Sequence, residues 1–186
     1  MTASLYPRMV QEYYVARLRA VAAARAGARA KVRKREHVLR LRAEVRRKLR
    51  SCFGPMPRRT ALKAVTTGCV RRKAYTIEKV IYESRPGFKV TANLYVPRGQ
   101  GPFPVVLGPC GHTQDGKASA TYQAFATGLA RRGYMVLVYD PLSQGERVQI
   151  TRRIASFRPG NCCHEHNMFG NRLALLGDFF GAWRAW

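Results

Sequence analysis

The chain has 186 residues, 46% of them hydrophobic, which is enough for one folded domain with a core and a helical extension. Its formal net charge of +24 is concentrated at one end: residues 1–75 hold 21 Lys and Arg against 3 acids, whereas residues 76–186 hold 13 against 7. No apolar run approaches the ~18–20 residues of a membrane span and no signal peptide is visible, so we expect a cytoplasmic protein without a membrane partner. The five cysteines, an odd number, argue against a complete disulfide framework.

Two amphipathic helices are predicted at the basic end of the chain. The first covers residues 7–25, and the second covers residues 36–53 and ends at Gly54-Pro55. The apolar stripe of the second consists of Val38, Leu41, Val45, Leu49 and Phe53. Because both helices carry such stripes, we expect them to pack on another part of the protein. An organelle transit peptide is a second interpretation of the Arg- and Ala-rich start.

The pattern from residue 75 onward predicts a mixed α/β domain. Strands are expected at residues 75–84 and 88–97, joined by an Arg-Pro-Gly turn as an antiparallel hairpin. Doubly apolar strands at 103–108 and 134–140 flank a helix at 117–132, which predicts a parallel β-α-β unit with a right-handed crossover. An irregular stretch, 141–166, and a last helix, 167–186, complete the chain. We therefore divide it into a basic helical region, 1–74, and an α/β domain, 75–186.

Two loops follow the doubly apolar strands, and their composition suggests a site. "GPCGHTQDGK" begins at Gly108, and "YDPLSQGER" begins at Tyr139. Open α/β sheets bind ligands at the carboxyl ends of their strands, and glycines there let backbone N–H groups approach a ligand or a developing oxyanion. The alternative is an ordinary loop in which Thr113 or Asp115 caps the helix.

Three other motifs are weak as sites. Ser143 has Gly at +2 but Pro at −2, so it does not lie in a G-x-S-x-G nucleophile elbow. Cys110 and His112 are only two residues apart, and no third group is evident that would orient such a pair. The string "NCCHEHN", residues 161–167, lacks the ligand spacing of a zinc site, so we interpret it as a polar loop that lines a cleft.

Taken together, "YTIEKVIYESRPGFKVTANLYVP", "GPFPVVLGPCGHTQDGKA", "YQAFATGLARRGYMVLVYDPLSQGER", "CCHEHNMFGN" and "GDFFGAWRAW" resemble the N-terminal half of an α/β-hydrolase. The closest group is the acetyl xylan esterase-like and dienelactone hydrolase-like proteins. The resemblance covers about residues 54–186 and extends into the preceding helices.

The resemblance implies a site with specific roles. The "PCGH" loop would be the oxyanion-hole loop, with backbone N–H donors at Gly111 and His112. Cys110, Gln144, Glu146 and His166 would line the substrate cleft. The substrate would be a small ester or an acylated carbohydrate, and neither a metal nor an organic cofactor would be needed.

The catalytic serine, acid and histidine of such proteins would lie beyond Trp186. We therefore expect a truncated and inactive copy of a carboxylic-ester hydrolase; a short protein that uses the scaffold for another purpose is the alternative. Two further alternatives are a basic nucleic-acid-binding protein, which we do not favour, and a non-catalytic binding module. Because the strand that should flank 103–108 is missing, we also expect self-association or aggregation.

Overall fold

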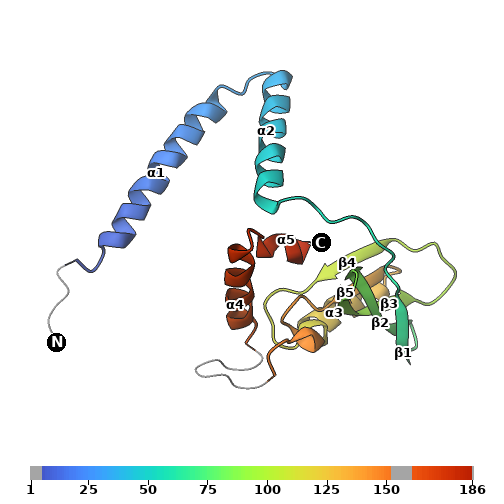
Figure 1. The fold of residues 1–186 in the computed structure, drawn as a ribbon. Helices are drawn as coiled ribbons and strands as arrows, with labels where there is room; N and C mark the ends of the chain where they lie inside the picture. The colour runs from blue at the N-terminus through green and yellow to red at the C-terminus, as the bar shows by residue number, and fades with distance from the viewer. Residues whose placement is uncertain (1–5, 152–160, 186) are drawn as a thin grey trace. The chain divides into compact units, whose positions relative to one another are not determined.

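The computed structural model describes residues 6–151 and 161–185 (Figure 1). The chain divides into two compact units, residues 1–52 and residues 53–186. This boundary lies earlier in the chain than the division at residue 74 that the sequence suggested. The reason is that residues 65–71 form a strand of the sheet, so the segment between the helices and the expected hairpin belongs to the second unit.

The first unit consists of two helices, α1 (Met9–Ala30) and α2 (Arg35–Phe53, whose last residue already belongs to the second unit). Helix α1 extends beyond the predicted residue 25 and passes through Gly27. A glycine in a helix costs only about 1 kcal/mol, and the Ala and Arg residues around it are strong helix formers. Neither helix contains a buried residue. The expectation that they pack on another part of the protein stays a prediction.

The second unit is built on a five-stranded sheet in the order β1-β2-β3-β5-β4. Its strands are β1 (Val65–Arg71), β2 (Tyr75–Arg85), β3 (Phe88–Pro97), β4 (Val105–Pro109) and β5 (Met135–Tyr139). The β2–β3 hairpin is antiparallel, and β4 and β5 are a parallel pair, as predicted. Antiparallel pairing of β3 with β5 joins the two parts into one sheet. Strand β1 was not predicted; it pairs with β2 on the outer edge.

Helix α3 (Ala120–Ala130) covers one face of the sheet, after a short 3₁₀ turn, η1 (Gly116–Ala118). The core on this face contains the following side chains: Tyr75, Tyr95, Cys110, Ala126, Ala130, Val136 and Val138. Gly108 lets the helix approach β4, because a Cβ there would lie 3.2 Å from the Phe125 ring and 3.3 Å from Val138. The parallel pair and its crossover helix thus form the two layers that place the loops after β4 and β5.

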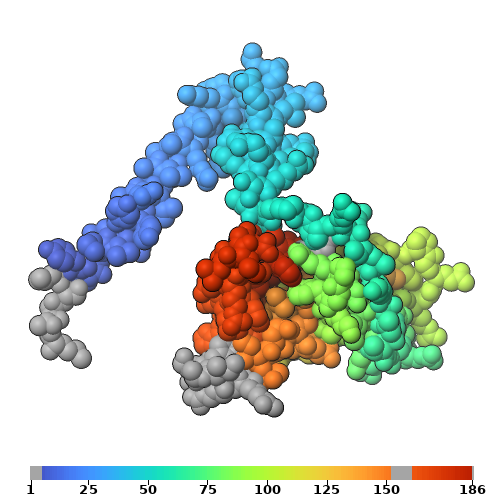
Figure 2. Space-filling model, in the orientation of Figure 1, coloured from blue at the N-terminus to red at the C-terminus, as the bar shows by residue number. Residues whose placement is uncertain are grey.

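The C-terminal helices contact the β2–β3 hairpin near its turn and the loop after β5, through Trp183 and His166 respectively. Helix α4 (Cys162–Leu175) begins where the sequence predicted a polar loop, because Asn161 caps it by accepting a hydrogen bond from the His164 N–H (3.2 Å). The single predicted helix 167–186 is also wrong: Gly177, at φ +76°, ends the helix, and α5 (Phe180–Ala185) follows. Figure 2 shows α4 and α5 in red beside the light-green β2–β3 turn, where Trp183 packs on Phe88 and Arg85.

Within the described residues, no helix combines the length and the apolar character that crossing a bilayer requires.

Candidate active-site rim

The loops after β4 and β5 meet at one end of the sheet because the two strands are parallel neighbours. The Gln144 side chain joins them: its Nε2 donates to the Gly111 carbonyl (2.6 Å) and to the Thr113 carbonyl (2.8 Å). The Gly145 N–H adds a third bond, to the Gln114 carbonyl (2.8 Å). The family resemblance implies that Gln144 lines the substrate cleft; in the structure its side chain is fully buried and bonded to the loop after β4.

A buried carboxylate at the end of β5 holds the same two loops from below. Asp140 accepts hydrogen bonds from the Thr91 hydroxyl (2.6 Å), the Lys117 N–H (2.7 Å) and the Glu146 N–H (3.3 Å). It also forms an ion pair with the Lys117 ammonium, which pairs with Glu146 as well. We call Thr91, Lys117, Asp140 and Glu146 the Asp140 cluster. Because Asp140 is fully buried, these donors compensate for the loss of its hydration.

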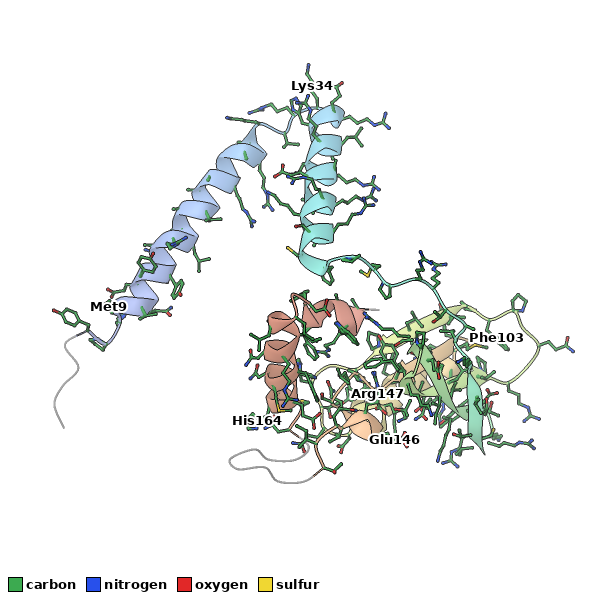
Figure 3. The ribbon with its side chains drawn as sticks, in the orientation of Figure 1. Met9, Lys34, Phe103, Glu146, Arg147 and His164 are labelled. Atoms are coloured by element: carbon green, nitrogen blue, oxygen red, sulfur yellow. The ribbon has the colours of Figure 1, made fainter. Side chains whose placement is uncertain are left out.

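Two glycines make room for the cluster. Gly116 (φ +52°) and Gly145 (φ +54°) have left-handed backbones, and a Cβ at either would overlap the Asp140 carboxylate. Glu146 and Arg147, both labelled in Figure 3, come from the short turn η2 (Gly145–Arg147). The Glu146 side chain is 70% exposed and contacts only the cluster's lysine, whereas buried Arg147 donates to the Asp140 carbonyl (2.8 Å).

The loop after β4 has a further contact with α3. The Gly111 N–H donates to the Tyr122 hydroxyl (2.6 Å), and a Cβ at Gly111 would lie 2.8 Å from that oxygen. The His112 N–H, by contrast, donates no hydrogen bond to the described part of the chain, and His112 is exposed. Of the two expected oxyanion donors, one is therefore engaged by a side chain and the other faces solvent.

His112 and His166 lie against one another. His112 Nε2 is 3.2 Å from His166 Nδ1, and His166 Nε2 is 2.9 Å from the Leu142 carbonyl. A carbonyl can only accept, so His166 carries its proton on Nε2 and its Nδ1 accepts from His112. Burial lowers the pKa of His166 from its usual value, an effect that Arg184 and His112 reinforce and that the Leu142 carbonyl and Glu165 oppose. The pair connects α4 to the loop after β4.

Cys110 is not poised as a nucleophile. Its side chain belongs to the core under α3, and burial, with the charge of Asp140 nearby, raises the pKa of its thiol to about 11. A thiol with such a pKa carries almost no thiolate at neutral pH. Ser143 is no better placed, because it is fully buried and its Oγ has no hydrogen-bond partner within the described residues.

The expected cleft residues are thus only partly together. Gln144 and His166 contact the loop after β4, at Gly111 and His112 respectively, whereas Glu146 faces outward and Cys110 lies in the core. A cavity of about 220 Å³ lies on the other face of the sheet, between Leu107, Leu137, Tyr139 and Trp183, and none of the expected cleft residues lines it. Within residues 6–151 and 161–185 no three Cys, His, Asp or Glu side chains are grouped as metal ligands.

Sequence reasoning missed the residues that hold the site in place: Lys117, Tyr122, Asp140 and Glu165. Glu165 is fully buried and accepts from the N–H groups of Gln149 (3.1 Å) and Ile150 (3.0 Å), so it holds the end of the loop after β5. For Asp140 a signal existed, since an acid directly follows a buried strand and glycines occur in both loops. For Tyr122 and Glu165 no local pattern distinguishes a partner of a loop from any other helical residue.

The sheet order, the parallel pair and the loops at its carboxyl end define the fold of the N-terminal part of an α/β-hydrolase, of the kind found in acetyl xylan esterases. A putative acetyl xylan esterase from Bacteroides fragilis matches with a TM-score of 0.61 and 16% identity, over 89% of this chain and 47% of that one. The acetyl xylan esterase of Paenibacillus sp. R4 matches with a TM-score of 0.39 and 17% identity, over 53% of this chain and 37% of that one.

In sequence, the chain is 34% identical over 82 residues to an uncharacterized protein of Pseudomonas aeruginosa. That match covers 42% of this chain and 21% of the relative. No protein-family model matches. The chain thus spans about half the length of the esterase structure and about a fifth of the curated relative.

Proposed function

We propose that this chain forms the N-terminal half of a carboxylic-ester hydrolase of the acetyl xylan esterase type and is inactive by itself. The observation that carries the proposal is the meeting of the two loops after β4 and β5 at one end of a sheet with this fold. The reaction would be acyl transfer. The nucleophilic serine, its histidine base and the orienting acid belong to the half of the fold that this chain does not include.

The role of the present residues in that reaction is to hold the oxyanion. When a serine attacks the ester carbonyl, negative charge develops on the carbonyl oxygen, and preorganised N–H groups stabilise it. The loop after β4 would supply one such donor, and the residue after the nucleophile would supply the other. The substrate class that we propose is a small acetyl ester, on an alcohol or a carbohydrate.

Hydrolysis of p-nitrophenyl acetate tests the proposal. The purified chain is expected to show no more activity than the double variant Ser143→Ala/Cys110→Ala, because neither side chain is placed as a nucleophile. A wild-type rate clearly above that of the double variant would contradict the proposal.

The second arm supplies the missing half. The polypeptide encoded after the codon for Trp186 is expected to contain a strand followed by G-x-S-x-G, and mixing it with this chain should produce serine-dependent hydrolysis. A downstream sequence without such an elbow, or a mixture that forms a complex but does not hydrolyse the ester, would contradict the proposed function.

A further inference from the structure

We propose that Gln144 is a positioning residue: its side-chain amide fixes the direction of the His112 N–H, which is the oxyanion donor of the loop after β4. The role of this N–H as an oxyanion donor rests on the proposed function, whereas its orientation by Gln144 is a property of this chain alone. It is carried by three observations: the two bonds of the Gln144 amide, the geometry of the peptide between Gly111 and His112, and the contact of Tyr122.

The orientation of the Gln144 side chain is determined by its partners. Its Nε2 carries two protons and lies 2.6 Å and 2.8 Å from two carbonyl oxygens, those of Gly111 and Thr113. Rotating the side-chain amide by 180° would place Oε1 against the same two carbonyl oxygens. All three oxygens are acceptors, so no hydrogen bond could form. Since Gln144 is fully buried, the side chain has no solvent to which it could turn instead. Both amide protons are therefore committed to the loop after β4.

Holding the Gly111 carbonyl also orients the His112 N–H. The two groups belong to one peptide unit, which is planar and trans, so the C=O and the N–H point in opposite directions. With its oxygen bonded to Gln144 in the interior, this peptide must direct its N–H away from the interior. The exposure of His112 is consistent with that direction. The second bond, to Thr113, prevents the loop from rotating about the first.

The Tyr122 hydroxyl decides which of the two expected donors is available. It accepts the Gly111 N–H at 2.6 Å, so that group is already satisfied. The His112 N–H donates to nothing in the described part of the chain. The assignment of the oxyanion donor to His112 rather than Gly111 follows from this difference.

The first test uses NMR on the wild-type chain. The two Gln144 side-chain amide protons are expected to exchange slowly and to show contacts with Gly111 and Thr113, whereas those of exposed Gln114 exchange as in a free glutamine. If the Gln144 protons exchange as fast as those of Gln114, the inference is wrong, whatever any variant does.

The second test uses two variants. Gln144→Met keeps the volume but has no donor, and the chemical shift of the His112 amide should change, because its peptide is no longer held. Gln144→Glu keeps the shape but has an O–H donor only in its acid form, and burial against two carbonyl oxygens raises the pKa of the new carboxyl above the usual value of Glu. Its His112 amide should return toward the wild-type signal as the pH falls through the pKa of the new carboxyl.

Gln123→Met is the matched control. Gln123 also donates its Nε2 to a backbone carbonyl, that of Ala118 (2.6 Å), but this carbonyl lies in η1 and not in the segment from Gly111 to Thr113. It should leave the His112 amide unchanged. A His112 signal that is unchanged in both folded Gln144 variants, or that in Gln144→Glu does not respond to pH, would overturn the inference, because a purely space-filling role predicts that result.

An activity arm separates this inference from the proposed function. In the serine-dependent mixture described above, Gln144→Met should lower kcat by ~10-fold or more with little change in KM, and Gln144→Glu should do so above the pKa of its new carboxyl, since loss of one oxyanion donor costs about 10²–10³ in kcat. If no mixture is active but the NMR results hold, the proposed function fails and the positioning stands. If the mixture is active and its kcat is unchanged by Gln144→Glu at every pH, the inference fails and the proposed function stands.

Discussion

Asp140 shows how one buried side chain can organise a rim made of two loops. Its carboxylate has partners from β3, from η1 and from η2, and its backbone carbonyl accepts from Arg147. The Lys117 side chain is only 9% exposed, so the pair has left water almost completely. Removing one partner of such a pair costs about 3–5 kcal/mol, because the other charge remains buried.

Gly145→Ala tests the space around this carboxylate. The new Cβ would overlap Asp140, so the variant must displace the carboxylate or the loop, and we expect a loss of about 3 kcal/mol or more in the free energy of unfolding. Urea denaturation measures it. The control is Gly133→Ala, which has φ +87° but no atom near the new Cβ and should cost only the strain of about 1–2 kcal/mol. Equal losses in the two variants would refute the crowding argument.

His166 gives the protein a predictable response to pH. Because its pKa is lowered in the folded chain, the unfolded chain takes up a proton first, at its ordinary value of about 6.5. The stability that neutral His166 provides is complete above that value and is lost as the pH falls from there through the lowered native pKa. His166→Gln should therefore flatten the fall in melting temperature between about pH 7.5 and pH 5.5.

The control for this experiment is His164→Gln, two residues earlier on α4, where the side chain is exposed. It shows whether a change in the profile depends on position 166 or on removing any imidazole from α4. The explanation fails if His166→Gln and the wild type lose melting temperature in parallel over this range.

At the scale of elements, β4 is an apolar edge of the sheet. It pairs only with β5, and its Val105 and Leu107 side chains are 60% and 65% exposed. The strand carries no charge, and an uncharged apolar edge is a template for pairing with another chain.

Leu107→Lys is expected to reduce self-association of the purified chain, measured by sedimentation velocity, without lowering its stability. Leu175→Lys is the matched control, because Leu175 is 88% exposed at the end of α4 and lies outside the sheet. It makes the same change in charge and hydrophobicity. If both variants reduce association equally, the effect comes from net charge and not from the strand edge.

The elements also indicate what a sequence can and cannot predict. The hairpin, the parallel pair and α3 were predicted to within a few residues, because strands buried on both faces and a helix with one apolar side have distinctive periodicities. Strand β1 was missed since an edge strand that is mostly exposed, with Gly68 beside a register shift, has no such pattern.

The break between α4 and α5 was missed for a different reason. Periodicity continues across it, but Gly177 and Asp178 donate to the carbonyls of Ala174 and Leu173, which is a Schellman termination. Gly177 is the sequence signal for this termination. The contacts of the site, such as Gln144 with Gly111, depend on how two loops distant in sequence meet, and no local pattern encodes them.

At the scale of the whole molecule, the net positive charge is shared equally by the two units, +12 in residues 1–52 and +12 in residues 53–186, where 19 Lys and Arg stand against 7 acids. Residues 1–52 hold 15 Lys and Arg against 3 acids, and the apolar stripe of α2 lies among them. Two interpretations of this unit stay open: docking of the stripe on protein, or binding of the basic surface to nucleic acid.

Leu49→Asp separates the two interpretations. If the stripe docks, a charge in it should increase cleavage by trypsin, because the released helix exposes its many arginines. Leu39→Asp is the control: Leu39 is 48% exposed against 52% for Leu49, but it lies about 100° from the stripe residue Val38 around the helix. Unchanged cleavage in Leu49→Asp, with loss of salt-dependent retention on DNA or RNA, would favour the nucleic-acid interpretation.

Because both loops bond to the Asp140 carboxylate, their local opening, as measured by hydrogen exchange, should be coupled. The amide protons of Lys117 and Glu146 lie 29 residues apart in sequence, in different loops, yet both donate to the same carboxyl group. A fluctuation that frees one amide by moving the carboxylate also frees the other, so the two should report one opening free energy in native-state hydrogen exchange. The Gly87 amide in the β2–β3 turn, which donates to Glu83, should open independently. The two loops of the rim then form a single cooperative unit of exchange.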